Sequence, residues 1–246
     1  MEVHHHPQVE KKNFKEYFLE FLMIFLAVTL GFFAENIRES RVNKEKEEHY
    51  IQNLIADLRA DSVNLKLTMA DQDRENHMLD SALKIPAERL ADIKVQDTFF
   101  HYIFLYYSYV PDFNQSTNTI SQLKAGGFNI MHNQATIDSI NYIYQLYGVV
   151  EFDNKYNETN YWDVAHKAQS IMRLPEPAVS PHDPSVNIIP NNRRIFLTND
   201  AIAIAQLYNV LGNSIGSFKT TLNAEKGALA KVVKLIAYLR KQYDIE

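Results

Sequence analysis

Residues 21–34, FLMIFLAVTLGFFA, constrain this chain most, because all fourteen are apolar or small and none is charged. A helix that spans a membrane needs about 20 apolar residues, whereas a run of roughly 10–14 is more often a core helix or the apolar part of a signal peptide. Extending the run back to Tyr17 gives eighteen positions but includes Glu20. Three interpretations therefore compete: a signal peptide, a buried soluble helix and a membrane anchor.

We favour an uncleaved membrane anchor over residues 16–36, preceded by a short tail at 1–15. A signal peptide is disfavoured, because no small-x-small cleavage site ends the run and the sequence continues into ENIRE in helical register. A soluble helix this apolar on all sides would have to be wrapped by the rest of the domain. Basic side chains that can reach lipid headgroups flank both ends of the run: Lys11, Lys12, Lys15, Arg38 and Arg41.

The predicted anchor has one face rich in small residues. At about 100° per residue, Glu20, Ala27, Gly31 and Ala34 lie on one narrow stripe. Ala27 and Gly31 form a small-xxx-small pair, which allows a second helix to approach closely. Glu20 has two interpretations: a carboxylate solvated at headgroup level, or a carboxylate inside a contact with another helix.

Composition restricts what the body at 37–246 can do. The net charge of −5 and the lack of basic clusters argue against a nucleic-acid partner, and the absence of cysteine excludes disulfides, thiol chemistry and cysteine–zinc sites. Basic residues lie on both sides of the anchor, so the positive-inside rule does not decide its orientation. We expect the tail inside and the body outside, which is the simplest arrangement for a short tail and an uncleaved anchor.

These patterns predict an all-α fold. The anchor continues into a long helix at 37–85, and a long helix at 199–243 returns antiparallel to it in a bundle or coiled coil. In both helices apolar residues recur at alternating spacings of four and three. The first seam comprises Ile51, Ile55, Leu58, Ser62, Leu65, Met69, Gln72, Asn76, Leu79 and Leu83, and it is polar at Ser62, Gln72 and Asn76. The second comprises Ile204, Tyr208, Leu211, Ile215, Phe218, Leu222, Glu225, Leu229, Val232, Ile236, Leu239 and Tyr243, with Glu225 its one polar exception.

The sequence pattern predicts a small aromatic-rich helical head at residues 87–172. A Pro-rich loop at 173–198 follows it. Within the head, Asn133 can cap a helix that contains residues 137–147. Residues 151–172 form a further helix. The loop holds five of the eight prolines, which excludes a helix there. The final helix is expected to begin at a capping residue, one of Thr198, Asn199 and Asp200.

The segments GFFAENIRE and TISQLKAGGFNIMHN resemble an uncharacterised family of small bacterial single-span membrane proteins. The resemblance covers residues 12–60 and 113–150. It implies an N-terminal anchor, an all-helical body and a bacterial inner membrane, with the body in the periplasm in the orientation expected above. It implies no activity and no site residues.

No catalytic, cofactor-binding or metal-binding constellation is recognisable, so we expect no cofactor and no enzyme activity. Phosphate-loop, nucleophile-elbow, zinc-protease and calcium-loop motifs are all absent from the sequence. The histidines beyond the run at 4–6 are scattered, and the acidic run at 45–48 is interpreted as a solvated face. Arg193 and Arg194 are candidates for contact with an anion or a partner's carboxylate, or are ordinary surface arginines.

Four functions remain open. The first is a non-enzymatic interaction or scaffold protein that associates with itself or with a membrane protein. The second is a sensor or ligand-binding module that signals through a partner, with aromatic residues of 99–109 and 142–147 lining its site. The third is an ion-conducting oligomer that uses Glu20. The fourth is an enzyme, for which the sequence offers no constellation.

Overall fold

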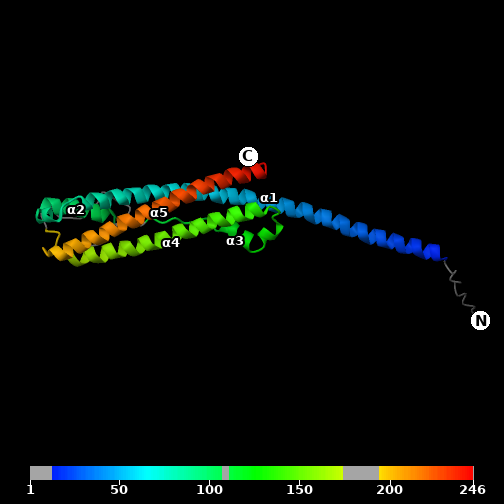
Figure 1. Cartoon of the computed structure of the whole chain (residues 1–246), viewed down its shortest axis with the longest axis horizontal. Helices are drawn as coiled ribbons and strands as arrows, with labels where there is room; N and C mark the ends of the chain where they lie inside the picture. The colour runs from blue at the N-terminus through cyan, green and yellow to red at the C-terminus, as the bar shows by residue number, and fades with distance from the viewer. Residues whose placement is uncertain (1–12, 107–110, 174–193, 246) are drawn as a thin grey trace, which may run out of the picture.

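The computed structural model describes residues 13–106, 111–173 and 194–245 (Figure 1). The histidine run at 4–6, Lys11, Lys12, Arg193 and the five prolines of the Pro-rich loop lie outside these ranges. All regular elements in the described part of the chain are helical. The predicted all-α fold class is therefore confirmed.

The predicted anchor and the first long helix form a single helix, α1 (Phe14–Leu83), of 70 residues. Its length is about 105 Å at 1.5 Å per residue. Gly31 is the only glycine or proline within it, and Pro86 follows its end. Near its N-terminus α1 carries a segment long and apolar enough to span a membrane, none of which is buried; no other helix in the described ranges passes this test. In Figure 1 this part extends alone beyond the other helices.

Two short elements cover α1 at its far end: a 3₁₀ turn, η1 (Ala87–Ala91), and α2 (Ile93–Tyr106). The chain then runs back along α1. Hydrogen bonds mark this path, since Asn64 Nδ2 donates to the Asn114 carbonyl at 2.8 Å and the His132 ring lies 3.0 Å from the Glu47 carboxylate. The short helices α3 (Asn118–Lys124) and η2 (Gly127–Ile130) lie on this return path, near the point where α1 enters the body.

Helix α4 (Gln134–Ile171) is one continuous helix of 38 residues. Residues 137–147 and 151–172 were expected to form two separate helices inside a small head. The structure differs because Gly148 keeps helical geometry and no proline lies in the segment. Asn133 is the N-cap, as predicted, and its Oδ1 accepts from the Thr136 N–H at 3.3 Å.

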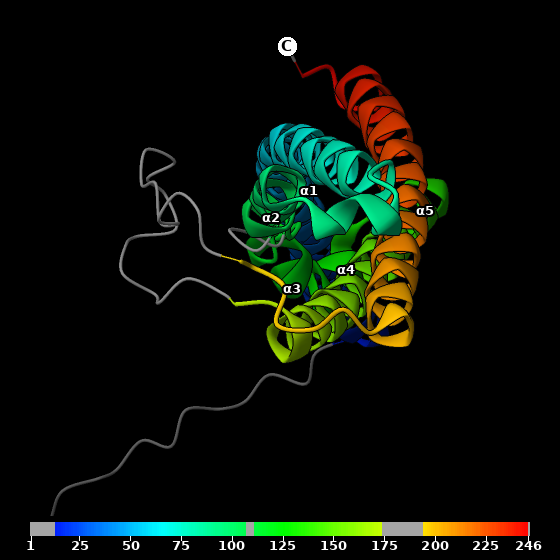
Figure 2. The same ribbon diagram turned by 90° about the vertical axis from the view of Figure 1, so that its left-hand side faces the viewer.

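Helix α5 (Ala201–Gln242) packs against both α1 and α4. Asp200 is its N-cap and accepts from the Ile202 N–H at 3.0 Å, which confirms one of the three predicted capping residues. The end-on view in Figure 2 shows α5 beside α4 and α1.

Hydrogen bonds fix the directions of the long helices. Tyr208 near the start of α5 reaches the Ile85 carbonyl at 2.6 Å, and Tyr243 at its end reaches Glu47 at 2.6 Å. Helix α5 therefore runs antiparallel to α1, and its end returns to the point where α1 enters the body. The Lys167–Gln206 hydrogen bond and the 3.2 Å contact between Thr136 and Tyr238 place α4 antiparallel to α5 as well.

The buried residues of α1 and α5 recur in heptads, but one edge of each predicted seam is shifted. The positions at Ile51, Leu58, Leu65, Gln72 and Leu79 are buried as expected. On the other edge of the α1 seam the predicted Ile55, Ser62 and Asn76 are buried, whereas Met69 and Leu83 are only partly buried. The residues that precede the five predicted positions are buried as well: Leu54, Asp61, Thr68, Glu75 and Ala82. In α5 the corresponding residues are Leu207, Ser214, Thr221, Ala228 and Leu235.

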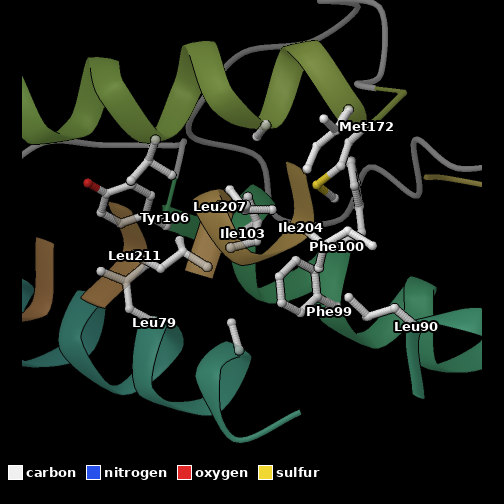
Figure 3. Packing of buried hydrophobic residues seen from close by; sticks show 14 of the residues in the cluster. Leu79, Leu90, Phe99, Phe100, Ile103, Tyr106, Met172, Ile204, Leu207 and Leu211 are labelled. Atoms are coloured by element: carbon white, nitrogen blue, oxygen red, sulfur yellow. The ribbon is translucent and has the colours of Figure 1, made fainter. Parts of the chain in front are cut away.

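Two hydrophobic clusters form the core of the body. The distal cluster, shown in Figure 3, joins the ends of α1 and α4 to α2 and the first half of α5, with Phe99, Ile103 and Leu211 fully buried. The proximal cluster lies nearer the exposed end of α1 and contains residues such as Leu58 and Tyr147. Gln96 closes the distal end, because its Oε1 accepts from the Ile195 and Phe196 N–H groups at 2.9 and 3.3 Å.

Candidate functional site

A belt of buried polar side chains separates the two hydrophobic clusters. We define the polar belt by nine buried residues on three helices: Thr68, Gln72, Glu75 and Asn76 of α1, Asn154, Asn157 and Asn160 of α4, and Thr221 and Glu225 of α5. Buried polar groups destabilise a helical body unless they are hydrogen-bonded to each other. Hydrophobic packing therefore explains the two clusters but does not explain why polar residues occupy the belt.

Hydrogen bonds within the belt connect the helices in pairs. Gln72 Nε2 of α1 donates to Glu225 Oε1 of α5 at 3.0 Å. Asn157 Nδ2 of α4 donates to Thr221 Oγ1 of α5 at 2.9 Å, and its Oδ1 accepts from Ser217. Because each bond needs its two residues at the same level, the belt fixes the register of α5 against both neighbours.

Two carboxyl groups of the belt have strongly raised pKa values. Burial raises the pKa of Glu225 to about 8; the hydrogen bond from Gln72 lowers it and the charge of Asp153 raises it. Burial likewise raises the pKa of Glu75 to about 8, against a lowering effect of Arg74. Both groups are therefore mostly protonated at pH 7, and the Gln72–Glu225 hydrogen bond is a neutral one.

Two further carboxylates of α1 anchor the return path. Asp61 Oδ1 accepts from the Ser116 N–H at 2.8 Å, and Asp57 Oδ2 accepts from the Thr119 N–H at 3.2 Å at the start of α3. The bond from Thr119 to Asp57 supplies a cap for α3, because the N-cap residue Thr117 makes no side-chain capping bond. Burial raises the pKa of Asp61, and the bonds from Ser116 oppose that shift.

Glu47 joins three segments where α1 enters the body. Its carboxylate lies 3.0 Å from His132 Nδ1 and accepts from the Tyr243 hydroxyl at 2.6 Å. Residues 45–48 were expected to form a solvated acidic face, and for Glu47 this prediction is wrong, since its side chain is buried. The heptad position of Glu47, seven residues before Leu54, was the signal that could have identified it.

The predicted interface residues of the anchor lie together on the exposed part of α1. Glu20, Ala27, Gly31 and Ala34 are all exposed, and a Cβ added to Gly31 would meet nothing within 4 Å. No described element covers this face. Its role as a contact with another helix stays a prediction.

Arg194 lies at the opposite end of the molecule, where it donates a hydrogen bond to Asn199. Asn199 lines a shallow pocket of about 280 Å³ together with Glu88, Phe196 and Thr198. No described side chain in the pocket lining is cationic. Because Arg193 lies outside the described residues, the predicted anion contact of the two arginines stays a prediction.

The aromatic residues assigned to a ligand site do not come together. Phe99 and Tyr106 lie in the distal cluster, whereas Tyr144 and Tyr147 belong to or contact the proximal cluster. Phe99 and Tyr147 are fully buried, and their rings pack on core neighbours such as Phe196 and Phe113. Phe99, Tyr106 and Tyr147 therefore act as core, whereas Tyr142 is exposed. Tyr107 and Tyr109 lie outside the described residues.

Comparison with protein families, with curated proteins and with solved structures finds no match to this chain. Within residues 13–106, 111–173 and 194–245, no group of three or more histidine or acidic side chains could hold a metal ion. The candidate features are thus the exposed face of α1 and the polar belt.

Proposed function

We propose that this chain is a membrane-anchored, non-enzymatic interaction protein of a bacterial inner membrane. The observation that carries the proposal is the continuity of α1, which connects an exposed apolar segment to the helical body without a break. In an aqueous compartment such a segment would be an unprotected apolar surface, whereas a bilayer covers it. We place the body in the periplasm.

The geometry favours a rigid support over a tethered enzyme. A flexible linker would let a catalytic domain move freely, but α1 crosses from the apolar segment into the body as helix throughout. The body in turn is held in one register by the Gln72–Glu225 and Asn157–Thr221 bonds. A partner bound to the body would therefore keep a fixed orientation to the membrane.

Fractionation of cells that express the full-length chain tests the anchor. We expect the protein in the membrane pellet after alkaline carbonate extraction and its release by mild detergent. The double variant Phe25→Arg/Leu26→Arg should shift it to the aqueous fraction, because each arginine at the centre of a membrane helix costs about 2.5–3.5 kcal/mol. The matched control is Ile202→Arg/Val233→Arg, which places the same charges at exposed apolar positions of α5.

Purification in mild detergent then tests the interaction. We expect an assembly whose mass exceeds that of the 28.5 kDa chain, with a fixed stoichiometry of its components. An aqueous wild-type protein, or a protein that stays monomeric and brings down nothing from crosslinked membranes, contradicts the proposed function.

A further inference from the structure

The part of α1 that packs against the other helices, which we call the stalk, carries a row of exposed apolar residues. This row, the stalk line, lies on the side of α1 that faces away from the body. Its members are Ala56, Ala60, Val63, Leu67 and Ala70, which recur at alternating spacings of four and three. All five are exposed, and Val63 and Leu67 remain 59% and 61% accessible although they lie beside the packed part of α1. A single exposed apolar residue needs no explanation, but a heptad line of five is typical of a second helix-packing face.

This line continues the small-residue stripe of the membrane segment. On a straight helix with 3.6 residues per turn, all five residues of the line lie within about 40° of Glu20, as do Ala27, Gly31 and Ala34. The combined surface, which we call the outer line, extends over about 65 Å from Ala27 to Ala70 at 1.5 Å per residue. The buried residues of α1, such as Leu58 and Leu65, lie on the opposite side.

We infer that the outer line is the contact between two copies of this chain, with their α1 helices parallel and in register. The inference rests on the proposed function, because only membrane insertion gives all copies the same direction and depth. A symmetric pair then sets each residue of the line against its own copy. Six of the eight apolar or small positions are alanine or glycine, so the two helices can approach closely along the membrane stripe and again along residues 56–70. Between these two parts the same side of α1 carries Arg38, Val42, Glu45, His49 and Gln52.

The two arginines on the outer line are compatible with a second copy, whereas Glu20 and Glu45 lie on the same stripe and would each face their own copy. Arg38 lies between the membrane stripe and the stalk line, and Arg74 lies one turn beyond Ala70. Each arginine is paired within its own helix, Arg38 Nε with Glu35 at 2.9 Å and Arg74 with Asp71 at 2.9 Å. A symmetric pair therefore does not bring two uncompensated arginines together.

The absence of cysteine makes disulfide mapping direct, because each engineered cysteine is the only thiol in the chain. Full-length variants Ala27→Cys, Ala56→Cys and Val63→Cys probe the outer line. Thr29→Cys and Lys66→Cys are the controls, since both positions are exposed but point about 180° and 80° away from Glu20. Isolated membranes are oxidised with copper phenanthroline and the dimer fraction is measured on a non-reducing gel.

We expect at least about fivefold more dimer at the three line positions than at the two controls, because a disulfide requires Cα atoms within about 7 Å. Adding Gly31→Leu to Val63→Cys should lower the dimer yield several-fold, whereas Leu30→Phe, off the line, should not. Equal yields at line and control positions, or dimers at Ala27→Cys without dimers at Ala56→Cys and Val63→Cys, overturn the inference.

The failures of the two proposals are distinguishable. An adduct of a line cysteine with a protein of different mass overturns the second copy as the occupant but leaves a membrane-anchored interaction protein. Wild-type protein in the aqueous fraction contradicts both the proposed function and the contact between two copies.

Discussion

Glu225 gives the sharpest test of the buried polar belt. It is fully buried, and its Oε1 accepts from Gln72 at 3.0 Å. Its pKa is about 8 in the folded chain against an ordinary value of 4.5. The folded state thus binds a proton that the unfolded state has lost between these two values. The favourable contribution is complete below pH 4.5 and is lost as the pH rises through 8.

Each pH unit between the two pKa values lowers the free energy of unfolding by about 1.4 kcal/mol. From 4.5 to 7 the loss is about 3 kcal/mol. Glu225→Gln keeps the size of the side chain and an acceptor for Gln72 but cannot ionise. We therefore expect the variant to exceed the wild type in melting temperature by roughly 6–12 °C at pH 7, at about 2–4 °C per kcal/mol, and to show little advantage at pH 4.5–5.

The assay uses circular dichroism to monitor thermal unfolding of the full-length protein in a non-ionic detergent. It is repeated at several pH values between 5 and 8. Glu158→Gln, at an exposed position of α4, is the control and should follow the wild-type curve. Parallel curves for Glu225→Gln and wild type across this range would refute the reasoning, because they would show that Glu225 titrates equally in the folded and unfolded states.

Three further substitutions test individual contacts. Gln96→Ala leaves the buried Ile195 and Phe196 N–H groups without an acceptor and should lower the free energy of unfolding by about 2–4 kcal/mol in denaturant titration, with exposed Gln52→Ala unchanged. Asp61→Ala should cost about 1–3 kcal/mol and speed amide exchange at Ser116. Glu47→Ala should speed exchange at the end of α5 and leave exchange in the distal cluster as it was.

The sequence predicted the elements whose signals are local. The apolar run, the missing helix breakers before Pro86 and the caps at Asn133 and Asp200 depend on neighbouring residues, and the structure has α1, α4 and α5 accordingly. Residues 137–147 and 151–172 were predicted as separate helices, but Gly148 between them costs only about 1 kcal/mol within a helix. The packing of α4 on α5 outweighs that cost.

The candidate site could not be predicted in the same way, because a search for apolar residues misses a polar seam. The predicted seams include Gln72, Asn76 and Glu225. They miss Asp61, Glu75 and Thr221, each of which occupies a buried heptad position one residue before a predicted one. Only the three-dimensional pairing of Gln72 with Glu225 shows that these two polar residues compensate each other. A heptad pattern that allows polar as well as apolar residues at buried positions would have identified Asp61, Glu75 and Thr221.

The unbroken course of α1 also sets a rule for chain length between the apolar segment and Glu47, where the body begins to enclose the helix. Each residue inserted there rotates the body by about 100° around the axis of α1 and lifts it by about 1.5 Å. Additions of 7, 11 or 18 residues nearly restore the original azimuth, whereas two residues turn the body to the opposite flank. Homologous chains should therefore differ in this stretch by whole turns, changing the height of the body above the bilayer while its azimuth stays constant.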